Sequence, residues 1–165
     1  MEDKLKITGE RNSSRAIVLN GKNEIFLFQY IFDYFKDGNI VWITPGGGIE
    51  PGENYEDALK REINEEMGIL LKEVPQSSYY RKATYTLKNG ENVIAHELFY
   101  VIHIENMDLN FRGWTESEKL RMKKGKWWSR EEIEKSADEF FSKDILSLID
   151  EACCYMKFDK PREIR

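Results

Sequence analysis

The sequence predicts a mixed fold of the α/β (α+β) class, in which two β-hairpins and a short strand are combined with amphipathic helices. Asn-Gly pairs, which readily adopt the positive φ angles of tight turns, separate β-prone runs at 20–23 and again at 88–91. Between these hairpins, residues 54–67 contain neither glycine nor proline and carry an apolar residue at every fourth position. We therefore expect a helix flanked by strands on both sides.

The first hairpin is predicted from the runs 16–19 and 24–28, which are rich in β-branched and aromatic residues. After an aromatic segment, a turn at 37–39 precedes a short predicted strand at 40–43. This strand ends at Thr44-Pro45, and a run of glycines follows directly.

The glycine run consists of Gly46, Gly47 and Gly48, and Pro51-Gly52 follows closely. Glycine permits tight turns and close approach of the backbone to a ligand, so we expect a loop that can fold against an anion. An ordinary tight turn explains this segment equally well when it is considered alone.

The helix predicted for 54–67 ends at Gly68, a residue suited to the left-handed conformation that closes many helices. Its apolar residues form one stripe: Leu59, Ile63 and Met67. Glu62, Glu65 and Glu66 cover about 100° of arc beside that stripe. A solvated acidic face is the alternative interpretation of these glutamates. Beside an anion-accommodating loop, however, they also provide the oxygen ligands that Mg²⁺ prefers.

The second half of the chain begins with a longer predicted hairpin, formed by 79–87 and 92–104. Residues 106–126 are polar and lack clear strand alternation, so we expect a surface excursion beside the site, where substrate selectivity would reside. The excursion contains a basic run, which is usually solvated but has the charge to attract a polyphosphate: Lys119, Arg121, Lys123, Lys124 and Lys126.

Two further helices are predicted near the C-terminal end. Ser129 and Glu132 have capping-box spacing, which indicates a helix start. Apolar spacing from Ile145 to about Met156 indicates another helix, and residues 158–165 resemble a fraying polar tail.

The central segment resembles the Nudix family, whose box is G-x5-E-x7-R-E-U-x-E-E-x-G-U, with U a bulky apolar residue. All fixed positions are present at the correct spacing: Gly47, Glu53, Arg61, Glu62, Ile63, Glu65, Glu66, Gly68 and Ile69. The lead-in Pro45-Gly46 also suits the pattern. The resemblance implies an α/β/α sandwich with a mixed β-sheet and a loop-helix-loop metal site, within a single domain over residues 1–165.

The resemblance also implies roles for the box residues. Glu62, Glu65 and Glu66 resemble the carboxylates that bind Mg²⁺, for which Mn²⁺ is a substitute, and Glu65 or Glu62 resembles the general base. Arg61 joins this catalytic group because its guanidinium can hold the loop against the helix by hydrogen bonds to a carboxylate. Glu53 resembles a further support of the loop, and Gly46, Gly47 and Gly48 resemble its phosphate-facing part.

Later carboxylates are candidates for an additional role at the metal. Glu118 is our first choice, and Glu97 and Glu116 are alternatives, although each is also explained as an exposed loop or strand charge. His96 is interpreted as a structural hydrogen-bonding residue. Several aromatic residues are suited to stacking on a nucleobase or to filling the core: Phe32, Tyr34, Tyr79, Tyr80, Trp127 and Trp128.

Composition limits the partners and the compartment. A chain of 165 residues with a formal net charge of -5 and a pI near 5.3 argues against a broad nucleic-acid or anionic-membrane surface. The adjacent Cys153 and Cys154 are poorly placed to pair with each other, so a reducing, cytoplasmic location is expected. A homodimer is compatible with the sequence, which does not determine the oligomeric state.

The sequence thus predicts a Mg²⁺-dependent pyrophosphatase that cleaves a phosphoanhydride bond in a small molecule, a nucleoside diphosphate linked to another moiety. The alternative is a catalytically silent nucleotide-binding regulatory module, which loss of box carboxylates would favour. A diphosphate isomerase is disfavoured because its reaction commonly uses a reactive cysteine in the pocket, whereas both cysteines lie in the predicted C-terminal helix.

Overall fold

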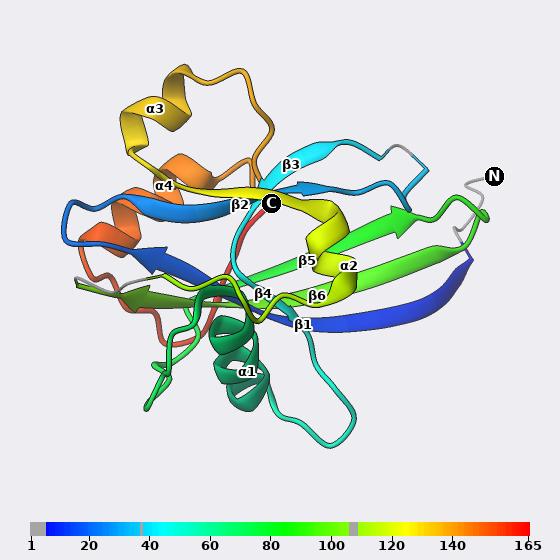
Figure 1. The fold of residues 1–165 in the computed structure, drawn as a ribbon, viewed down its shortest axis with the longest axis horizontal. Coiled ribbons are helices and arrows are strands. Elements are labelled where there is room, and N and C mark those ends of the chain that lie inside the picture. The colour runs from blue at the N-terminus through cyan, green and yellow to red at the C-terminus, as the bar shows by residue number, and fades with distance from the viewer. Residues whose placement is uncertain (1–5, 37, 106–108) are drawn as a thin grey trace.

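The computed structural model describes residues 6–36, 38–105 and 109–165, so parts of the predicted turn at 37–39 and of the excursion at 106–126 lie outside it (Figure 1). The strands are β1 (Ile7–Leu19), β2 (Ile25–Ile31), β3 (Ile40–Ile43), β4 (Gly46–Gly48), β5 (Tyr79–Thr86), β6 (Asn92–His103), β7 (Met122–Trp128) and β8 (Arg162–Glu163). The helices are α1 (Tyr55–Met67), α2 (Glu116–Arg121), α3 (Arg130–Lys135) and α4 (Ile145–Cys153).

The strands form one mixed sheet with β1 near its centre. The order across the sheet is β3-β2-β1-β6-β5-β8, while β4 pairs with β1 and β7 pairs with β2. Both predicted hairpins are present, because β1 meets β2 and β5 meets β6 in antiparallel pairs. Between the two hairpins, β1 and β6 run parallel along almost their whole length.

Both faces of the sheet are covered, which explains why the central strands are apolar on both sides. Figure 1 shows α1 below the central strands and α3 above them, and α4 packs in the core cluster on the face opposite α1. In β1, Ala16 and Val18 pack in one cluster with the apolar stripe of α1, whereas Ile17 and Leu19 pack in the opposite cluster with α4. This alternation follows from the two-residue period of a strand. The structure is the α/β/α sandwich that the sequence predicts.

The excursion at 106–126 contains more regular structure than predicted. Thr115 and Glu118 form a capping box that begins α2, and β7 follows directly and pairs with β2. The lysines of β7 interrupt the alternation of apolar and polar residues by which a strand is predicted. Two of them nevertheless cover aromatic rings, since Lys124 lies over the Trp42 ring and Lys126 lies over the Trp128 ring. Long lysine stems can cover aromatic surface while the ammonium stays in water, so a lysine-rich run can form a strand.

The predicted polar tail is wrong for the last residues. Strand β8 pairs in parallel with β5, and Ile164 is only 3% exposed because it packs in the cluster that contains α4. The Ile164 amide donates to the Tyr80 carbonyl at 2.9 Å, and the Ser142 hydroxyl donates to the Arg165 carbonyl at 2.6 Å. Backbone pairing and one buried side chain therefore fix a segment whose composition is polar.

Within residues 6–36, 38–105 and 109–165, no helix combines the length and apolar character that a bilayer-spanning segment needs. Cys153 and Cys154 are both free thiols. The predicted compartment stays a prediction.

Candidate functional site

Helix α1 is defined at both ends by local chemistry. The Asn54 side chain accepts a hydrogen bond from the Asp57 amide at 2.8 Å, and Gly68 closes the helix in the left-handed conformation with φ of 70°. Both ends agree with the sequence prediction. The helix buries not only its apolar stripe but also Glu62 and Glu66, which are 8% and 4% exposed.

The glycine run forms strand β4 rather than the open loop that the sequence predicts. Because β4 pairs with Ser13–Arg15 of β1, its backbone lies close to these two carboxylates. The Gly46 amide donates to Oε2 of Glu66 at 2.8 Å. Gly46 has φ of 134°, and a Cβ there would lie 2.2 Å from the Ser14 carbonyl oxygen. A Cβ on Gly47 would lie 2.5 Å from Oε1 of Glu62. Gly46 therefore leaves no room for a Cβ against the backbone of β1, whereas a Cβ on Gly47 would require the Glu62 carboxylate to shift.

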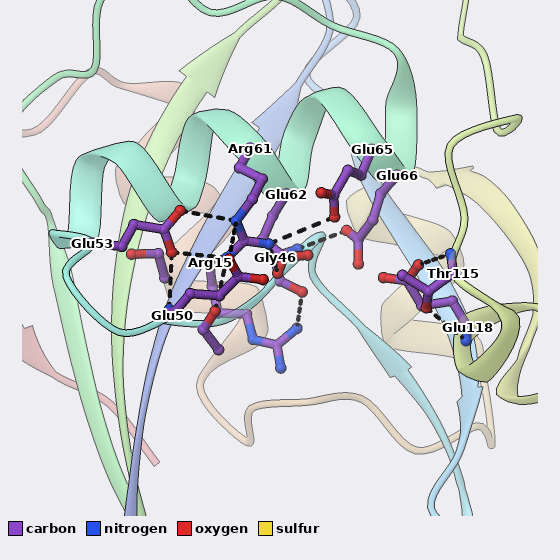
Figure 2. A network of polar contacts seen from close by, with 12 residues as sticks. Arg15, Gly46, Glu50, Glu53, Arg61, Glu62, Glu65, Glu66, Thr115 and Glu118 are labelled. Atoms are coloured by element: carbon purple, nitrogen blue, oxygen red, sulfur yellow. Dashed lines mark hydrogen bonds and ion pairs between the residues drawn. The ribbon is translucent and has the colours of Figure 1, made fainter.

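Arg61 joins the loop to the helix, as the sequence predicts for this position (Figure 2). Its Nε and Nη2 donate to the two carboxylate oxygens of Glu53 at 2.8 and 2.9 Å. Its Nη1 donates to Oε1 of Glu62 at 2.7 Å, and Nη2 also donates to the Gly48 carbonyl at 3.0 Å. The hydrogen bonds that Arg61 donates to Glu53 are the largest of the contributions that raise the pKa of Arg61. One guanidinium therefore fixes the loop carboxylate, the loop backbone and a buried glutamate together.

Three carboxylates from two helices converge beside β4. Glu62, Glu66 and Glu118 each offer an oxygen, and these atoms lie within 4.8 Å of one another. Figure 2 shows Glu118 facing Glu66 from the opposite side of the site. Burial, and next the nearby Glu62 carboxylate, raise the pKa of Glu66 well above its ordinary value, and burial also raises that of Glu62. Closely spaced carboxylates of this kind are destabilised by mutual repulsion and by desolvation.

This group, which we call the carboxylate triad (Glu62, Glu66 and Glu118), fits a hard divalent cation. Mg²⁺ and Mn²⁺ take carboxylate oxygens, and a bound cation would offset both the burial and the repulsion from Glu62 that raise the pKa of Glu66. Glu65, the third predicted metal ligand, is not a member of the triad, and Glu118 completes it instead. The Glu65 side chain is 34% exposed and lies 3.6 Å from Nη1 of Arg61.

A cavity of about 460 Å³ extends from the carboxylate triad. One side, which we call the aromatic wall, consists of Tyr30, Phe32, Tyr34, Phe35 and Tyr85. Gly46, Gly47 and Gly48 line the cavity near the triad, and three arginines line it as well: Arg11, Arg15 and Arg81. The cavity therefore combines the carboxylate triad, three arginines and a cluster of aromatic rings in mutual contact.

The other candidate carboxylates have separate environments. Glu97 lines the cavity but pairs with Arg15 at 3.5 Å and with Arg81 through a 2.7 Å hydrogen bond. The Glu116 side chain is 91% exposed and pairs with Lys119 of its own helix. Glu118 is thus the later carboxylate that meets the box glutamates.

The histidine, tryptophan and cysteine candidates, and the tyrosines at 79 and 80, do not line the cavity. His96 shares a 2.8 Å hydrogen bond with the Tyr80 hydroxyl, and Tyr79 and Trp128 are buried in the core. The Cys153 thiol contacts the Asn23 carbonyl, and burial raises its pKa, which makes it less reactive. The cavity lining includes neither cysteine.

Sequence reasoning missed Arg15, although a signal was present. Arg15 interrupts a buried run between Ser14 and Ala16, which are fully buried. A charged residue in such a run requires partners. Here the Arg15 guanidinium donates to the Gly46 carbonyl at 2.9 Å and pairs with Glu97. Its partners are far away in sequence, so the pattern marks the position without identifying the contacts.

Comparison with known proteins adds independent findings. A model of the NUDIX domain matches residues 9–149. The chain is 60% identical over 57 residues to the nucleoside triphosphatase NudI of Escherichia fergusonii, a match that covers 32% of this chain and 40% of that protein. It is 33% identical over 90 residues to NudI of Escherichia coli O81, covering 48% of this chain and 64% of that protein. The matches thus span less than two thirds of these relatives' length.

Solved structures share the fold at lower identity. The MutT protein of Methanosarcina mazei matches with a TM-score of 0.61 and 18% identity, covering 89% of this chain and 95% of that one. The NUDIX domain of Shewanella oneidensis NrtR, solved in complex with ADP ribose, matches with a TM-score of 0.60 and 16% identity, covering 88% of each chain. These likenesses concern the arrangement of helices and strands.

Proposed function

The chain belongs to the Nudix family, and from this premise we propose that it hydrolyses a phosphoanhydride bond in a nucleoside diphosphate linked to another moiety. The observation that carries the proposal is the carboxylate triad, whose oxygens lie within 4.8 Å of one another at the edge of the cavity. The family supports the bond type, and the triad supports the metal requirement.

We propose that Glu62, Glu66 and Glu118 hold Mg²⁺, with Mn²⁺ as a substitute. When bound, such an ion neutralises phosphate oxygens and lowers the pKa of water. The chain's own residues prepare the site for it. Arg61 orients Glu62, and the Gly46 amide orients Glu66 through its 2.8 Å hydrogen bond.

We assign the general base to Glu65, with Glu62 as the alternative. Glu65 lies on the same helix as Glu62 and Glu66 without belonging to the carboxylate triad (Figure 2). Its ion pair with Arg61 is long, at 3.6 Å, so its carboxylate can accept a proton from water. Its side chain is more exposed than that of Glu62, which is 10% exposed and bonded to Arg61. In hydrolysis the water gives this proton to Glu65, and its oxygen forms a bond to one phosphorus. The bond between that phosphorus and the bridging oxygen breaks, and the bridging oxygen leaves with the second phosphate.

The remainder of the cavity supports a nucleotide substrate. The aromatic wall offers aromatic rings against which a base can stack. Arg11 lies near Gly48, within the lining, where a phosphate that extends from the carboxylate triad would meet its guanidinium. The relatives named as nucleoside triphosphatases make nucleoside triphosphates the first substrates to test.

The test measures phosphate, pyrophosphate and nucleotide release with Mg²⁺ across nucleoside triphosphates, nucleotide sugars and dinucleoside polyphosphates. We expect Glu66→Gln, which preserves shape but removes a charge, to lower kcat by at least about 100-fold, since metal-dependent charge stabilisation is worth several kcal/mol. Glu56→Gln is the matched control, because Glu56 is an exposed carboxylate in the first turn of the same helix. Tight nucleotide binding without turnover by the unaltered chain would refute hydrolysis and favour the silent binding module.

A further inference from the structure

Glu118 belongs to the carboxylate triad although its own helix contributes nothing to the core. Helix α2 spans only Glu116–Arg121 and has no buried residue. Glu118 also caps this helix, since its Oε2 accepts a 2.6 Å hydrogen bond from the Thr115 amide. The capping box holds the carboxylate relative to α2, but contacts outside the helix must hold α2 relative to Glu62 and Glu66.

The N-terminal side of α2 is held by the segment before it. The Trp114 indole N–H donates to the Glu66 carbonyl at 3.0 Å, and its ring packs edge-on against Phe28 at 5.7 Å. A Cβ on Gly113 would lie 2.4 Å from the Glu65 carbonyl oxygen, so this segment lies directly against α1. These contacts fix the N-terminal end of α2, and its C-terminal end continues into Met122 of β7, which is buried and pairs with Tyr30 of β2.

Arg121 adds side-chain contacts at the C-terminal end of α2. Its Nε donates to Oδ1 of Asp33 at 2.9 Å, and its guanidinium lies over the Tyr34 ring at 5.3 Å. Its Nη1 also donates to the Ser117 hydroxyl within α2 at 2.7 Å. Asp33 lies between Phe32 and Tyr34 of the aromatic wall, so Arg121 joins α2 to the segment after β2.

We propose that Arg121, through Asp33, is a positioning residue that holds Glu118 in the carboxylate triad; this inference rests on the proposed function. Neither Arg121 nor Asp33 is among the residues that line the cavity, so the pair acts from outside it. Without the pair, α2 keeps its anchors at Trp114 and at Met122 but loses its side-chain contact with the segment after β2, so Glu118 departs more often from Glu62 and Glu66. The triad then loses part of its affinity for a divalent cation before any substrate is present.

A charge argument makes the opposite prediction for Arg121, which allows a sharp test. Replacing a cation near a cation-binding site by a neutral residue removes repulsion, so an electrostatic role predicts tighter metal binding for Arg121→Gln. A positioning role predicts weaker binding. The ion pair is partly exposed, since the side chains of Arg121 and Asp33 are 27% and 55% accessible. We therefore expect the affinity for the metal ion to fall about twofold to fivefold, the range typical of surface ion pairs.

The experiment titrates the full chain with Mn²⁺ alone and measures free Mn²⁺ by electron paramagnetic resonance. Arg121→Gln and Asp33→Asn are each expected to weaken binding, and the double variant is expected to bind no worse than the weaker single variant because both remove one interaction. Lys119→Gln is the matched control, since it removes a cation and an ion pair from the same helix but leaves the Asp33 contact intact. It is expected to bind Mn²⁺ as tightly as the unaltered chain or more tightly.

Glu118→Gln separates this inference from the proposed function. If Glu118→Gln weakens Mn²⁺ binding while Arg121→Gln leaves it unchanged or tightens it, the positioning role is overturned and the proposed triad stands. If Glu118→Gln has no effect, the proposed role of Glu118 is wrong, and Arg121 cannot position it for metal binding. Circular dichroism melting of each variant verifies that a weaker titration comes from a folded chain.

Discussion

Replacement of Arg61 tests whether a single guanidinium stabilises the loop and the helix together. Arg61→Ala removes four hydrogen bonds: two to Glu53, one to Glu62 and one to the Gly48 carbonyl. The Arg61 and Glu53 side chains are 23% and 15% exposed. Breaking a fully buried pair costs about 3–5 kcal/mol and an exposed pair about 0–1 kcal/mol. This environment is intermediate, so we expect a loss of about 2–3 kcal/mol in the free energy of unfolding.

Arg61→Lys distinguishes geometry from charge. Lysine retains the positive charge but lacks the planar fork that serves both oxygens of Glu53, so we expect about half of the alanine loss. Urea unfolding, followed by circular dichroism without divalent cations, gives both free energies. Lys60→Ala removes a neighbouring cation from the same helix and serves as the control, with an expected change within about 0.5 kcal/mol. Equal stability of the lysine variant and the unaltered chain would refute the bidentate argument.

The pH dependence of this difference has a defined sign. The hydrogen bond from Arg61 lowers the pKa of Glu53 in the folded chain. A carboxylate with a lowered folded pKa contributes stability above its unfolded pKa, and this contribution is lost as the pH falls through the folded value. The stability difference between the unaltered chain and Arg61→Ala should therefore be full near neutral pH and decrease below about pH 4. A difference that grows with acidification would contradict the assignment.

The remaining predictions concern the glycines, the C-terminal segment and the metal. Gly46→Ala should destabilise the fold by at least about 2 kcal/mol in urea unfolding, because its positive φ and the Ser14 carbonyl leave no room for a Cβ. Gly47→Ala should instead retain most stability but weaken Mn²⁺ binding, since its Cβ displaces only the flexible end of Glu62; equal Mn²⁺ affinity would argue against Glu62 as a ligand. Ile164→Ala should cost about 2–4 kcal/mol by opening a cavity in the core, whereas a loss within experimental error would show that the segment is not docked in solution. Mg²⁺ at a hundredfold excess over its Kd should stabilise the chain by about 2.7 kcal/mol and raise Tm. Glu66→Gln should lose this stabilisation, and a Tm increase that survives in this variant would place the ion elsewhere.

Elements with local signals were predicted from the sequence, whereas elements that depend on distant partners were not. Asn54 and Gly68 define the ends of α1 through neighbouring backbone groups, and Gly90 gives the second hairpin turn its positive φ of 87°, whereas in the first turn Asn23 rather than Asn20-Gly21 has the positive φ. By contrast, β8 has two residues and exists because the edge of β5 is free to pair. A two-residue polar segment contains no periodicity from which this pairing can be predicted.

Capping chemistry shows that a local signal is useful only when its context is recognised. Ser129 with Glu132 and Thr115 with Glu118 form the same capping box, and both begin a six-residue helix. Only the first was identified from the sequence, although each helix contains one apolar residue: Ile133 of α3 is buried, whereas Leu120 of α2 is 70% exposed. Helix α2 buries no residue, so it lacks the apolar stripe that makes a helix visible in a sequence.

The carboxylate triad shows how far helical geometry alone can determine a site. At about 100° per residue, Glu66 lies about 60° from Ile63 at the centre of the apolar stripe, Glu62 about 100° and Glu65 about 160°. Exposure follows this order: Glu66 is 4% and Glu62 8% exposed, whereas the Glu65 side chain is 34% exposed. The angle therefore separates two inward-facing carboxylates from an outward-facing one without a structure. No such angle relates Glu118 to them, because its position depends on contacts between segments far apart in the chain, through Trp114 at one end of α2 and Arg121 at the other.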